Sequence, residues 1–397
     1  MINYPKGYSA CGLHCGIKKA KDDLTVVVSD VAASAAAVYT NNLFQAAPLQ
    51  VTKKHLESDG MAQAVVINSG IANAAMGKQG IIDAESVAKK LAETFELDEN
   101  HTIVASTGVI GMPLPVETIN AGIDMAKDAL KPLNESAELA SRGIMTTDTV
   151  PKTASTTINI AGKEVCFWGM CKGAGMIHPN MSTMLGFVFC DAAITSEVLQ
   201  KALSDAIGDS FNMISVDGDT STNDMVTVLA NGLAGNAVID ALENDDYELF
   251  ATALKEICVS LAKQIVADGE GATKLFAVKV INAPTTTDAK TIARAVVSSS
   301  LVKAAMYGRD ANWGRIACAA GYSGAVFDPY KMDIYIGDVL VAQNGQGLSF
   351  DEEKALDILS KDTIDVLIDL HEGSAEATGW GCDLTHDYVS INADYRS

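Results

Sequence analysis

A glycine-rich turn leads directly into a continuous apolar run within residues 172–191 of this 397-residue chain. Gly173 and Gly175 lie in the turn, and residues 184–190, Met-Leu-Gly-Phe-Val-Phe-Cys, carry no charge. A short apolar run that follows turn residues is typical of a buried strand. Glycines upstream of the run also allow another backbone to come close. The segment therefore predicts a buried strand with Thr183 at its mouth.

Strand-like and helix-like segments alternate along the rest of the chain. The clearest helix covers residues 247–267, where apolar side chains recur every three or four positions and Gly269 lies just beyond the end. Residues 152–160 and 164–168 indicate a hairpin that turns at Ala161 and Gly162. We expect further strands over 24–28 and 64–68, and further helices over 84–97, 117–130, 289–297 and 351–359 and after a candidate N-cap at Thr195.

A break in this pattern divides the chain. Pro284 is followed by Thr285-Thr-Thr-Asp, a composition typical of a turn before a new helix. We therefore predict one domain over residues 1–284 and a smaller αβ domain over residues 285–397. The alternation of strands and helices places both in a mixed α/β fold class.

Charge and composition argue against several classes of function. The formal net charge is −21, which opposes binding to nucleic acid or to anionic membranes. The first residues carry no apolar signal segment, and no run of about 18 apolar residues exists, so we expect a cytoplasmic protein without a membrane span. The eight cysteines are dispersed, and Cys11-Gly-Leu-His14-Cys15 lacks a second ligand pair at zinc spacing. We expect reduced thiols, no metal and no cofactor.

Thr183 is a candidate nucleophile because its hydroxyl lies at the edge of the predicted strand. The chain has no Gly-x-Ser-x-Gly motif, and no histidine is obviously paired with Thr183. Cleavage between Ser182 and Thr183 would free an α-amine with a reference pKa of about 7.7–8.0, which is basic enough to take the hydroxyl proton. From spacing alone, a structural turn with a buried threonine is the favoured interpretation.

Long blocks of sequence change that balance. The block around the candidate nucleophile reads Lys172-Gly-Ala-Gly-Met-Ile-His-Pro-Asn-Met-Ser-Thr-Met-Leu. Other blocks begin at Asn68 (Asn-Ser-Gly), Ser106 (Ser-Thr-Gly-Val-Ile-Gly), Met145 (Met-Thr-Thr-Asp-Thr), Val216 (Val-Asp-Gly-Asp-Thr-Ser-Thr-Asn-Asp), Asp268 (Asp-Gly-Glu-Gly-Ala-Thr-Lys), Asn312 (Asn-Trp-Gly-Arg-Ile) and Asn392 (Asn-Ala-Asp-Tyr-Arg-Ser). In these blocks, over essentially its whole length, the chain resembles the ornithine acetyltransferase family. Ser182 departs from the alanine that the family usually has there.

The resemblance implies a fold and an activity. The fold is an αββα sandwich with a smaller appended αβ domain. The activity is that of a glutamate N-acetyltransferase of arginine biosynthesis, which moves the acetyl group of N2-acetylornithine to glutamate through an acetyl ester of Thr183. Autocatalytic cleavage would give chains of residues 1–182 and 183–397, assembled as an α2β2 heterotetramer. Whether acetyl-CoA also serves as a donor stays open, because no discrete nucleotide-binding motif decides it.

The resemblance also assigns roles to individual residues. Thr107 and Gly108 match the pair that binds the oxyanion. Lys172 matches the active-site lysine, whose charge could anchor an α-carboxylate. A substrate-binding threonine corresponds to Thr146 or Thr147, and we prefer Thr146. The other predicted binding residues are Thr183 itself, Glu270 for an ammonium group of ornithine, and Asn392 and Ser397 in the tail.

Two alternatives keep these residues but change the function. A related self-cleaving aminopeptidase or amidohydrolase would pass the acyl group to water, so acetylated glutamate among the products separates it from a transferase. An uncleaved protein that only holds amino acids would stay at full length. Asp217-Gly-Asp219 resembles a cation loop but lacks a full ligand set, so we interpret it as a structural turn, and Trp313 and Arg315 as structural residues.

Overall fold

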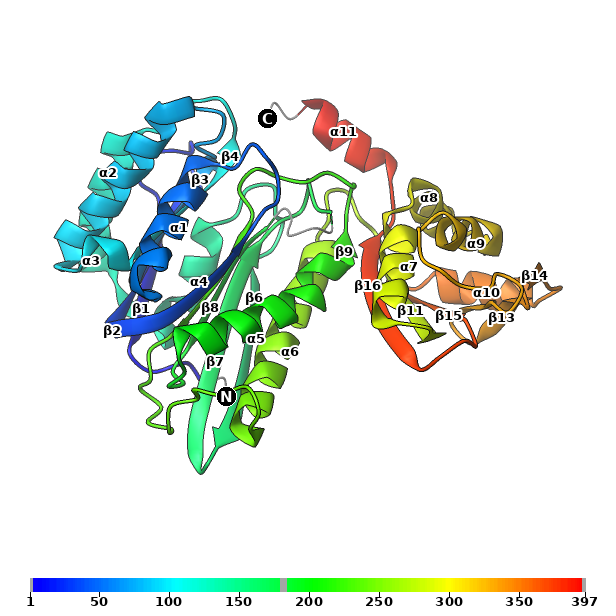
Figure 1. Ribbon diagram of the computed structural model, residues 1–397. Coiled ribbons are helices and arrows are strands. Elements are labelled where there is room, and N and C mark those ends of the chain that lie inside the picture. The colour runs from blue at the N-terminus through cyan, green and yellow to red at the C-terminus, as the bar shows by residue number, and fades with distance from the viewer. Residues whose placement is uncertain (1–2, 179–183, 395–397) are drawn as a thin grey trace.

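The computed structural model describes residues 3–178 and 184–394. Over these residues the chain forms eleven α-helices and two β-sheets, one of nine strands and one of seven (Figure 1). The predicted mixed α/β fold class is therefore confirmed. No helix within the described ranges is long and apolar enough to cross a membrane.

The two sheets are built mainly from different parts of the chain, except that β9 of the second sheet lies between β8 and β10 of the first. The first sheet contains β1 (Tyr8–Leu13), β2 (Leu24–Tyr39), β3 (Met61–Ile71), β4 (Thr102–Val109), β5 (Lys131–Pro132), β6 (Lys152–Ile160), β7 (Lys163–Lys172), β8 (Leu185–Cys190) and β10 (Met225–Ala230). The second contains β9 (Ile214–Ser215), β11 (Leu275–Ala283), β12 (Asp333–Ile336), β13 (Val339–Gln343), β14 (Gln346–Gly347), β15 (Thr363–Asp369) and β16 (Ala375–Cys382).

Helices precede, separate and follow these strands. They are α1 (Ala47–Asp59), α2 (Gly77–Phe95), α3 (Val116–Ala129), α4 (Leu133–Gly143), α5 (Ser196–Gly208), α6 (Asp245–Ala267), α7 (Thr286–Ser298), α8 (Ser300–Gly308), α9 (Trp313–Gly321), α10 (Glu352–Leu359) and α11 (His386–Asp394). Two short 3₁₀ turns, η1 (Glu99–His101) and η2 (Phe211–Met213), complete the described secondary structure.

The first sheet curls at its long central strand, β2. Its order is β4-β3-β2-β10-β8-β7-β6, and β1 also pairs with β2. The register of β2 against β3 shifts between Val28 and Ala33, and β2 pairs with β1 before this point and with β10 after it. Such an irregularity bends a strand and increases its local twist. The curl brings β4 and β7, from different halves of the sheet, against one shared cluster of buried side chains.

One hydrophobic cluster fills the space between the two halves of the curled sheet. Side chains alternate along each strand, so Val65 and Ile67 of β3 face the same cluster as Phe187 and Phe189 of β8. Trp168 of β7 stacks on Phe189 with their ring centroids 5.8 Å apart. Helix α4 adds side chains to the same cluster. The two half-sheets are therefore held face to face by packing of their inward side chains.

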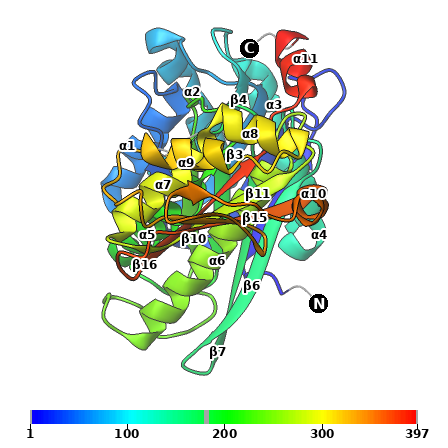
Figure 2. The same cartoon turned by 90° about the vertical axis from the view of Figure 1, so that its right-hand side faces the viewer.

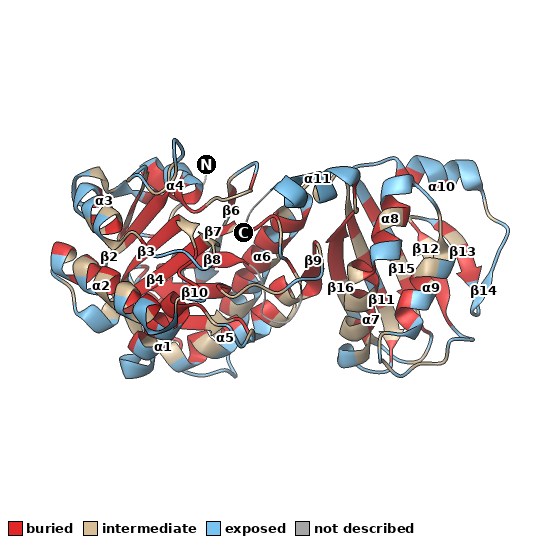
Figure 3. Cartoon of the chain, turned by 90° about the horizontal axis from the view of Figure 1, so that it is seen from above, coloured by how far each residue is buried: buried red, intermediate tan, exposed pale blue. Residues whose placement is uncertain are grey.

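Helices cover the outer face of each half-sheet. α1, α2 and α3 pack on outward residues of β2, β3 and β4, among them Val66 and Val104. α5 and α6 pack on outward residues of β7, β8 and β10, among them Phe167, Val188 and Val228. Figure 3 shows the buried strands between helices whose outer surfaces are exposed. The order of layers is helices, half-sheet, half-sheet, helices, which is the expected αββα sandwich.

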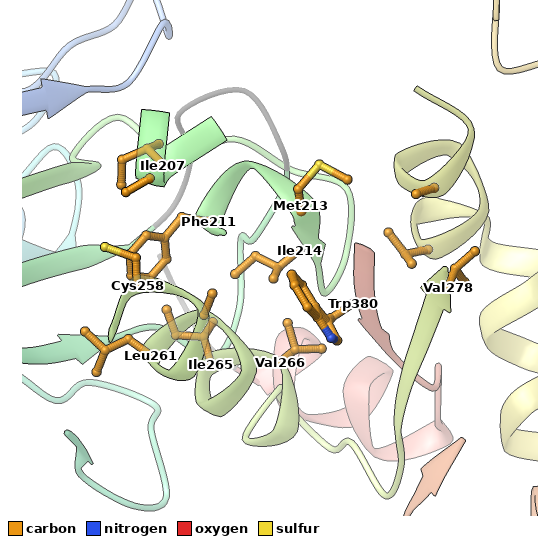
Figure 4. Close-up of a cluster of buried hydrophobic side chains, with 14 of the residues drawn as sticks. Ile207, Phe211, Met213, Ile214, Cys258, Leu261, Ile265, Val266, Val278 and Trp380 are labelled. Atoms are coloured by element: carbon orange, nitrogen blue, oxygen red, sulfur yellow. The ribbon is translucent and has the colours of Figure 1, made fainter. Parts of the chain in front are cut away.

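The second sheet lies beside the sandwich and has the order β14-β13-β12-β15-β11-β16-β9. Helix α7 packs along β11 and β16 (Figure 2). Met213, Ile214, Val266 of α6 and Trp380 of β16 belong to one buried cluster, so the core is continuous between the two sheets (Figure 4). The second sheet takes β11 from residues ahead of the predicted domain boundary at residue 284, and the division into domains stays a prediction.

The predicted elements differ from the observed ones mainly in length. The hairpin is confirmed, since β6 and β7 pair antiparallel around Ala161 and Gly162. The helix predicted over 247–267 is α6, and Asn244 caps it by accepting a hydrogen bond from the backbone of Tyr247. β2 continues to Tyr39 although only residues 24–28 were expected. Its second part is mostly alanine, whose strand propensity is low, and pairing with β10 decides the conformation there.

Candidate active site

Thr107 and Gly108 lie at the end of β4, where β4 runs parallel to β3. Gly108 is opposite Gly70 in the register and has a φ of +131°, which glycine adopts far more readily than other residues. A Cβ on Gly108 would lie 2.2 Å from the carbonyl carbon of Gly70, so a larger residue would require backbone movement. Thr107 is buried beside it. The two strands therefore fix the backbone of the predicted oxyanion pair.

Lys172 ends β7 and reaches across to β4. Its Nζ donates a hydrogen bond to the hydroxyl of Thr107 over 2.9 Å. Burial lowers the pKa of Lys172, while the nearby carboxylates of Asp148, Asp224 and Glu270 act in the opposite sense. The curl of the sheet thus brings two predicted site residues, one from each half, into direct contact.

A buried ion network adjoins Lys172, and the sequence analysis did not identify it. Lys152 is fully buried and binds two carboxylates, with its Nζ 2.6 Å from Asp148 Oδ1 and 2.5 Å from Asp268 Oδ2. Burial alone would raise the pKa of Asp148, but Lys152, Lys172 and accepted hydrogen bonds outweigh it and hold the pKa at about 2. Asp148 therefore stays ionised and forms a fixed negative charge beside the site.

Asp148 connects this network to two of the predicted binding segments. Its Oδ1 accepts a hydrogen bond from the backbone N–H of Gly173 over 2.7 Å, and its Oδ2 accepts one from the backbone N–H of Thr146 over 2.9 Å. Thr146 and Thr147 both lie half-buried in the segment after α4. Because Gly173 follows Lys172 directly, the same carboxylate positions both the lysine and the threonine segment.

Glu270 lies just beyond α6, against the glycine-rich turn. Its backbone N–H donates to the carbonyl of Ala174 over 2.8 Å, and a Cβ on Gly175 would lie 2.4 Å from its carboxylate. A glycine at position 175 therefore permits this close approach. Asn392 of α11 donates from Nδ2 to Glu270 Oε2 over 2.8 Å. The structure thus brings together two residues that were predicted to bind substrate.

Asp217 joins α11 to the turn ahead of the predicted cleavage site. Its carboxylate accepts hydrogen bonds from the backbone N–H groups of Met176 and Ile177, over 2.6 Å and 2.9 Å. It also accepts one from the hydroxyl of Tyr388 of α11 over 3.2 Å. Burial raises the pKa of Asp217, and the backbone donors act in the opposite sense. The predicted structural turn is therefore an anchor for two segments that border the site.

Ser182, Thr183 and Ser397 lie outside the described residues. Met184, which follows Thr183, is held just before β8, because its carbonyl accepts a hydrogen bond from the backbone N–H of Met225 over 3.1 Å. Within residues 3–178 and 184–394, no three His, Cys, Asp or Glu side chains gather as a set that could hold a metal ion.

The assembled groups suit chemistry on an acylated amino acid. The hydroxyl of Thr107 and the backbone at Gly108 can stabilise a developing oxyanion. Lys172 is the predicted partner of a carboxylate, and Glu270 is the predicted partner of an ammonium group. These charges come from separate strands and loops that meet around the glycine-rich turn.

Known proteins resemble the chain over its full length. The model of the ArgJ family matches residues 9–397. The chain belongs to the ArgJ family. The "Arginine biosynthesis bifunctional protein ArgJ" of Symbiobacterium thermophilum is 50% identical over 399 residues, which cover 100% of this chain and 98% of that protein. The protein of the same name from Thermotoga neapolitana is 47% identical, and 99% of each chain is covered.

A solved structure of an ArgJ protein agrees with this membership. The crystal structure from Bacillus halodurans superposes with a TM-score of 0.51 and 48% sequence identity, and it covers 54% of this chain and 100% of that chain. The predicted family and the predicted acyltransferase class are therefore confirmed. The roles of the individual site residues stay predictions.

Proposed function

We propose that this protein is an arginine-biosynthetic enzyme that transfers the acetyl group of N2-acetylornithine to glutamate. The observation that carries the proposal is the contact of Lys172 with Thr107 beside Gly108. The contact supports the proposal because the predicted carboxylate-binding lysine and the predicted oxyanion donors are neighbours, at the turn that leads to Thr183. Glu270 with Asn392 adds a site for the amino group of the same substrate. Both relatives named above carry arginine biosynthesis in their names.

The first half of the reaction releases ornithine. The hydroxyl oxygen of Thr183 attacks the acetyl carbonyl carbon, and its proton passes to the α-amine of Thr183. The bond from the carbonyl carbon to the α-nitrogen of ornithine breaks, and that nitrogen takes the proton as it leaves. The product is an acetyl ester of Thr183. Thr107 and the Gly108 backbone stabilise the oxyanion that forms on the way.

The second half regenerates the threonine. The unprotonated α-amine of glutamate attacks the ester carbonyl, and the bond from that carbon to the oxygen of Thr183 breaks. The proton lost by the glutamate nitrogen returns to Thr183 through its α-amine. The two half-reactions share one nucleophile and one oxyanion site, so the kinetics are ping-pong.

The free α-amine requires cleavage between Ser182 and Thr183. The hydroxyl of Thr183 attacks the carbonyl of Ser182, the peptide nitrogen leaves as the new α-amine, and water hydrolyses the resulting ester. Support comes from the Bacillus halodurans structure, whose single chain is matched along 100% of its length yet covers only 54% of this one. That share fits a product of residues 183–397. We place the cleaved chains in the cytoplasm as an α2β2 assembly.

Steady-state kinetics with both acetylornithine and glutamate varied test the reaction. Parallel lines in double-reciprocal plots, together with an acetyl group on the peptide that begins at Thr183, are expected. Intersecting lines without acetylated Thr183 contradict the acetyl-enzyme. Products that contain free acetate but no acetylglutamate would indicate a hydrolase instead. Replacing acetylornithine by acetyl-CoA in the same assay measures whether the thioester is a second donor.

Intact-mass measurement tests the cleavage. The purified protein is expected as two chains that separate only on denaturation, and Thr183→Ala is expected as one chain of 397 residues. Thr252→Ala, which alters an exposed threonine of α6, serves as the matched control and should be cleaved like the wild type. A Thr183→Ala protein that still splits at the same bond would show that another group performs the cleavage.

A further inference from the structure

Lys18 approaches the site from a third direction. A Cβ on Gly70 would lie 3.4 Å from Lys18 Cγ, and Gly70 is the strand partner of Gly108. The Nζ of Lys18 donates a hydrogen bond to the carbonyl of Met145 over 2.6 Å, directly before Thr146. The lysine therefore borders both the oxyanion strand and the predicted threonine segment.

The loop that carries Lys18 is firmly held. The fully buried carboxylate of Asp23 accepts hydrogen bonds from the backbone N–H groups of Cys15, Gly16 and Lys18, over 2.7, 3.2 and 2.9 Å. The Nζ of Lys18 donates a second hydrogen bond, to the carbonyl of Asp22 over 2.9 Å. The position of this side chain is thus fixed by the fold before a substrate binds.

The proposed reaction requires one site to bind two side chains of opposite charge, and the other site residues do not account for both. Ornithine has a cationic side chain and glutamate an anionic one, yet both must bind at the same acetyl-threonine. Lys172 can take the α-carboxylate that the two share. Glu270 suits an ammonium group and repels the side-chain carboxylate of glutamate. A second cation is needed for the glutamate half of the reaction.

We propose that Lys18 is the specificity-determining cation that pairs with the side-chain carboxylate of glutamate. This inference rests on the proposed function and names the residue that lets one site accept both amino acids. An ammonium has three donors, of which two are engaged by the carbonyls of Met145 and Asp22. The third proton is the one available to a carboxylate. A neutral amine would donate both of its protons to the two carbonyls and have none for a carboxylate.

The surroundings of Lys18 make its charge adjustable. Burial lowers the pKa of Lys18 to about 8, and the charges of Lys21 and Lys172 act in the same sense, while Asp23 and Asp148 oppose them. At neutral pH the protonated form prevails and glutamate is attracted. As the pH rises through about 8 the third proton is lost, so the affinity for glutamate falls. The cationic side chain of ornithine gains from the same loss of charge.

The two half-reactions can be measured separately to test this role. Release of ornithine from acetylornithine reports the first, and discharge of the acetyl-enzyme at increasing glutamate concentration reports the second. In Lys18→Met we expect the half-saturating glutamate concentration to rise about tenfold to hundredfold, the usual effect of losing a hydrogen bond to a charged group. Ornithine release is expected to change little. Lys19→Met, at the exposed neighbouring position, is the matched control and should resemble the wild type.

The pH dependence of glutamate affinity in Lys18→Arg separates a charge role of Lys18 from a purely structural one. The arginine keeps a permanent charge, so the wild-type loss of glutamate affinity above about pH 8 should disappear. Equal slowing of both half-reactions in Lys18→Met, or an unchanged alkaline loss in Lys18→Arg, overturns the proposal. If Lys18→Met does not fold, the pH profile of Lys18→Arg alone decides. If the wild type never acetylates glutamate, the proposed function and this role of Lys18 are both wrong. If the wild type acetylates glutamate but Lys18→Met slows both half-reactions equally, only the role of Lys18 is wrong.

Discussion

The two sides of the candidate site are built in different ways. On the strand side, Thr107 is only 6% exposed, Gly108 is locked against Gly70, and Lys172 is positioned through the buried pair of Asp148 and Lys152. On the tail side, no residue of α11 is buried, and the helix lies at the surface (Figure 3). Its polar links to the rest of the site run through the hydroxyl of Tyr388 and the amide of Asn392.

With the predicted roles of these residues, stabilisation of the oxyanion and recognition of the ammonium group fall to different structural elements. Stabilising an oxyanion requires donors that do not move during the reaction, and strands in a packed sheet provide them. Recognising an amino acid requires groups that can move as the substrate enters and leaves. A surface helix held by a few hydrogen bonds allows such movement. Changes to Thr107 or Asp148 on the strand side should therefore lower turnover or stability, and changes to Glu270 or α11 on the tail side should weaken binding.

The largest effect is expected from Thr107→Ala on the strand side. Loss of one oxyanion donor should lower kcat with acetylornithine by about a hundredfold to a thousandfold, with a much smaller change in KM, because this contact strengthens in the transition state. Thr107→Ser keeps the hydroxyl and is the matched control, so it should retain most of the activity. A change confined to KM would mean that Thr107 binds substrate rather than stabilising the transition state, and it would contradict the division between the two sides.

Asp148→Asn tests the rigidity of the strand side through stability. Removing one carboxylate from the buried pair with Lys152 should cost roughly 3 kcal/mol of unfolding free energy, since Lys152 loses part of its compensation. Denaturant unfolding of the cleaved, assembled protein measures this cost. Asp357→Asn, at an exposed position of α10, should be neutral. Equal stability of both variants would mean that the buried network does not stiffen the site.

The pH dependence of stability gives a second measure of the same carboxylate. The pKa of Asp148 is lowered from 3.8 to about 2, so its contribution is fully present above pH 3.8 and is lost as the pH falls through about 2. The shift corresponds to about 2 kcal/mol. The wild type should therefore lose more stability than Asp148→Asn between these pH values. Parallel acid denaturation curves would contradict the assignment.

Glu270→Gln should act on recognition and have a smaller effect. Glutamine keeps an oxygen that can accept the hydrogen bond from Asn392, so the substitution isolates the loss of charge. Because Glu270 is only half-buried, we expect KM for acetylornithine to rise by about tenfold with kcat nearly unchanged. Glu256→Gln, at an exposed position of α6, is the control. A fall in kcat instead would place Glu270 in the chemical step.

Much of this division could be predicted from the sequence, and the remainder has a physical reason for being missed. The strand was predicted because residues 184–190 form a continuous apolar run. The helix α6 was predicted because its apolar residues recur every three or four positions. The resemblance supplied Thr107, Lys172, Glu270 and Asn392 as site residues. The contact of Lys172 with Thr107 depends on the curl of β2, which a run of alanines does not reveal. The contact of Asn392 with Glu270 depends on α11, which follows β16 of the second sheet.

The supporting charges were missed for a different reason. Lys152 was assigned only to a hairpin strand, because nothing local distinguishes a buried lysine from an exposed one. Its partner Asp268 lies 116 positions away, and only the packing of α6 on the sheet brings the two together. Lys18 was given no role, since its contact with Met145 spans 127 positions. Long-range polar pairs inside a sheet fold follow from topology rather than from spacing.

The smallest expected effect is that of Tyr388→Phe, which tests how α11 is held. The substitution removes only the hydroxyl that donates to Asp217, and the carboxylate keeps its two backbone donors from Met176 and Ile177. A hydrogen bond of this kind contributes about 1 kcal/mol, so KM for acetylornithine should rise by roughly fivefold. The value of kcat should stay the same, because the strand side is untouched.

Tyr330→Phe, at a tyrosine that is 78% exposed, is the control. Steady-state kinetics measure both constants, and limited proteolysis should cut the tail of Tyr388→Phe sooner than that of the wild type. A loss of kcat without earlier proteolysis would mean that Tyr388 acts through Asp217 on the turn before Thr183, and the tail would then share in the chemistry.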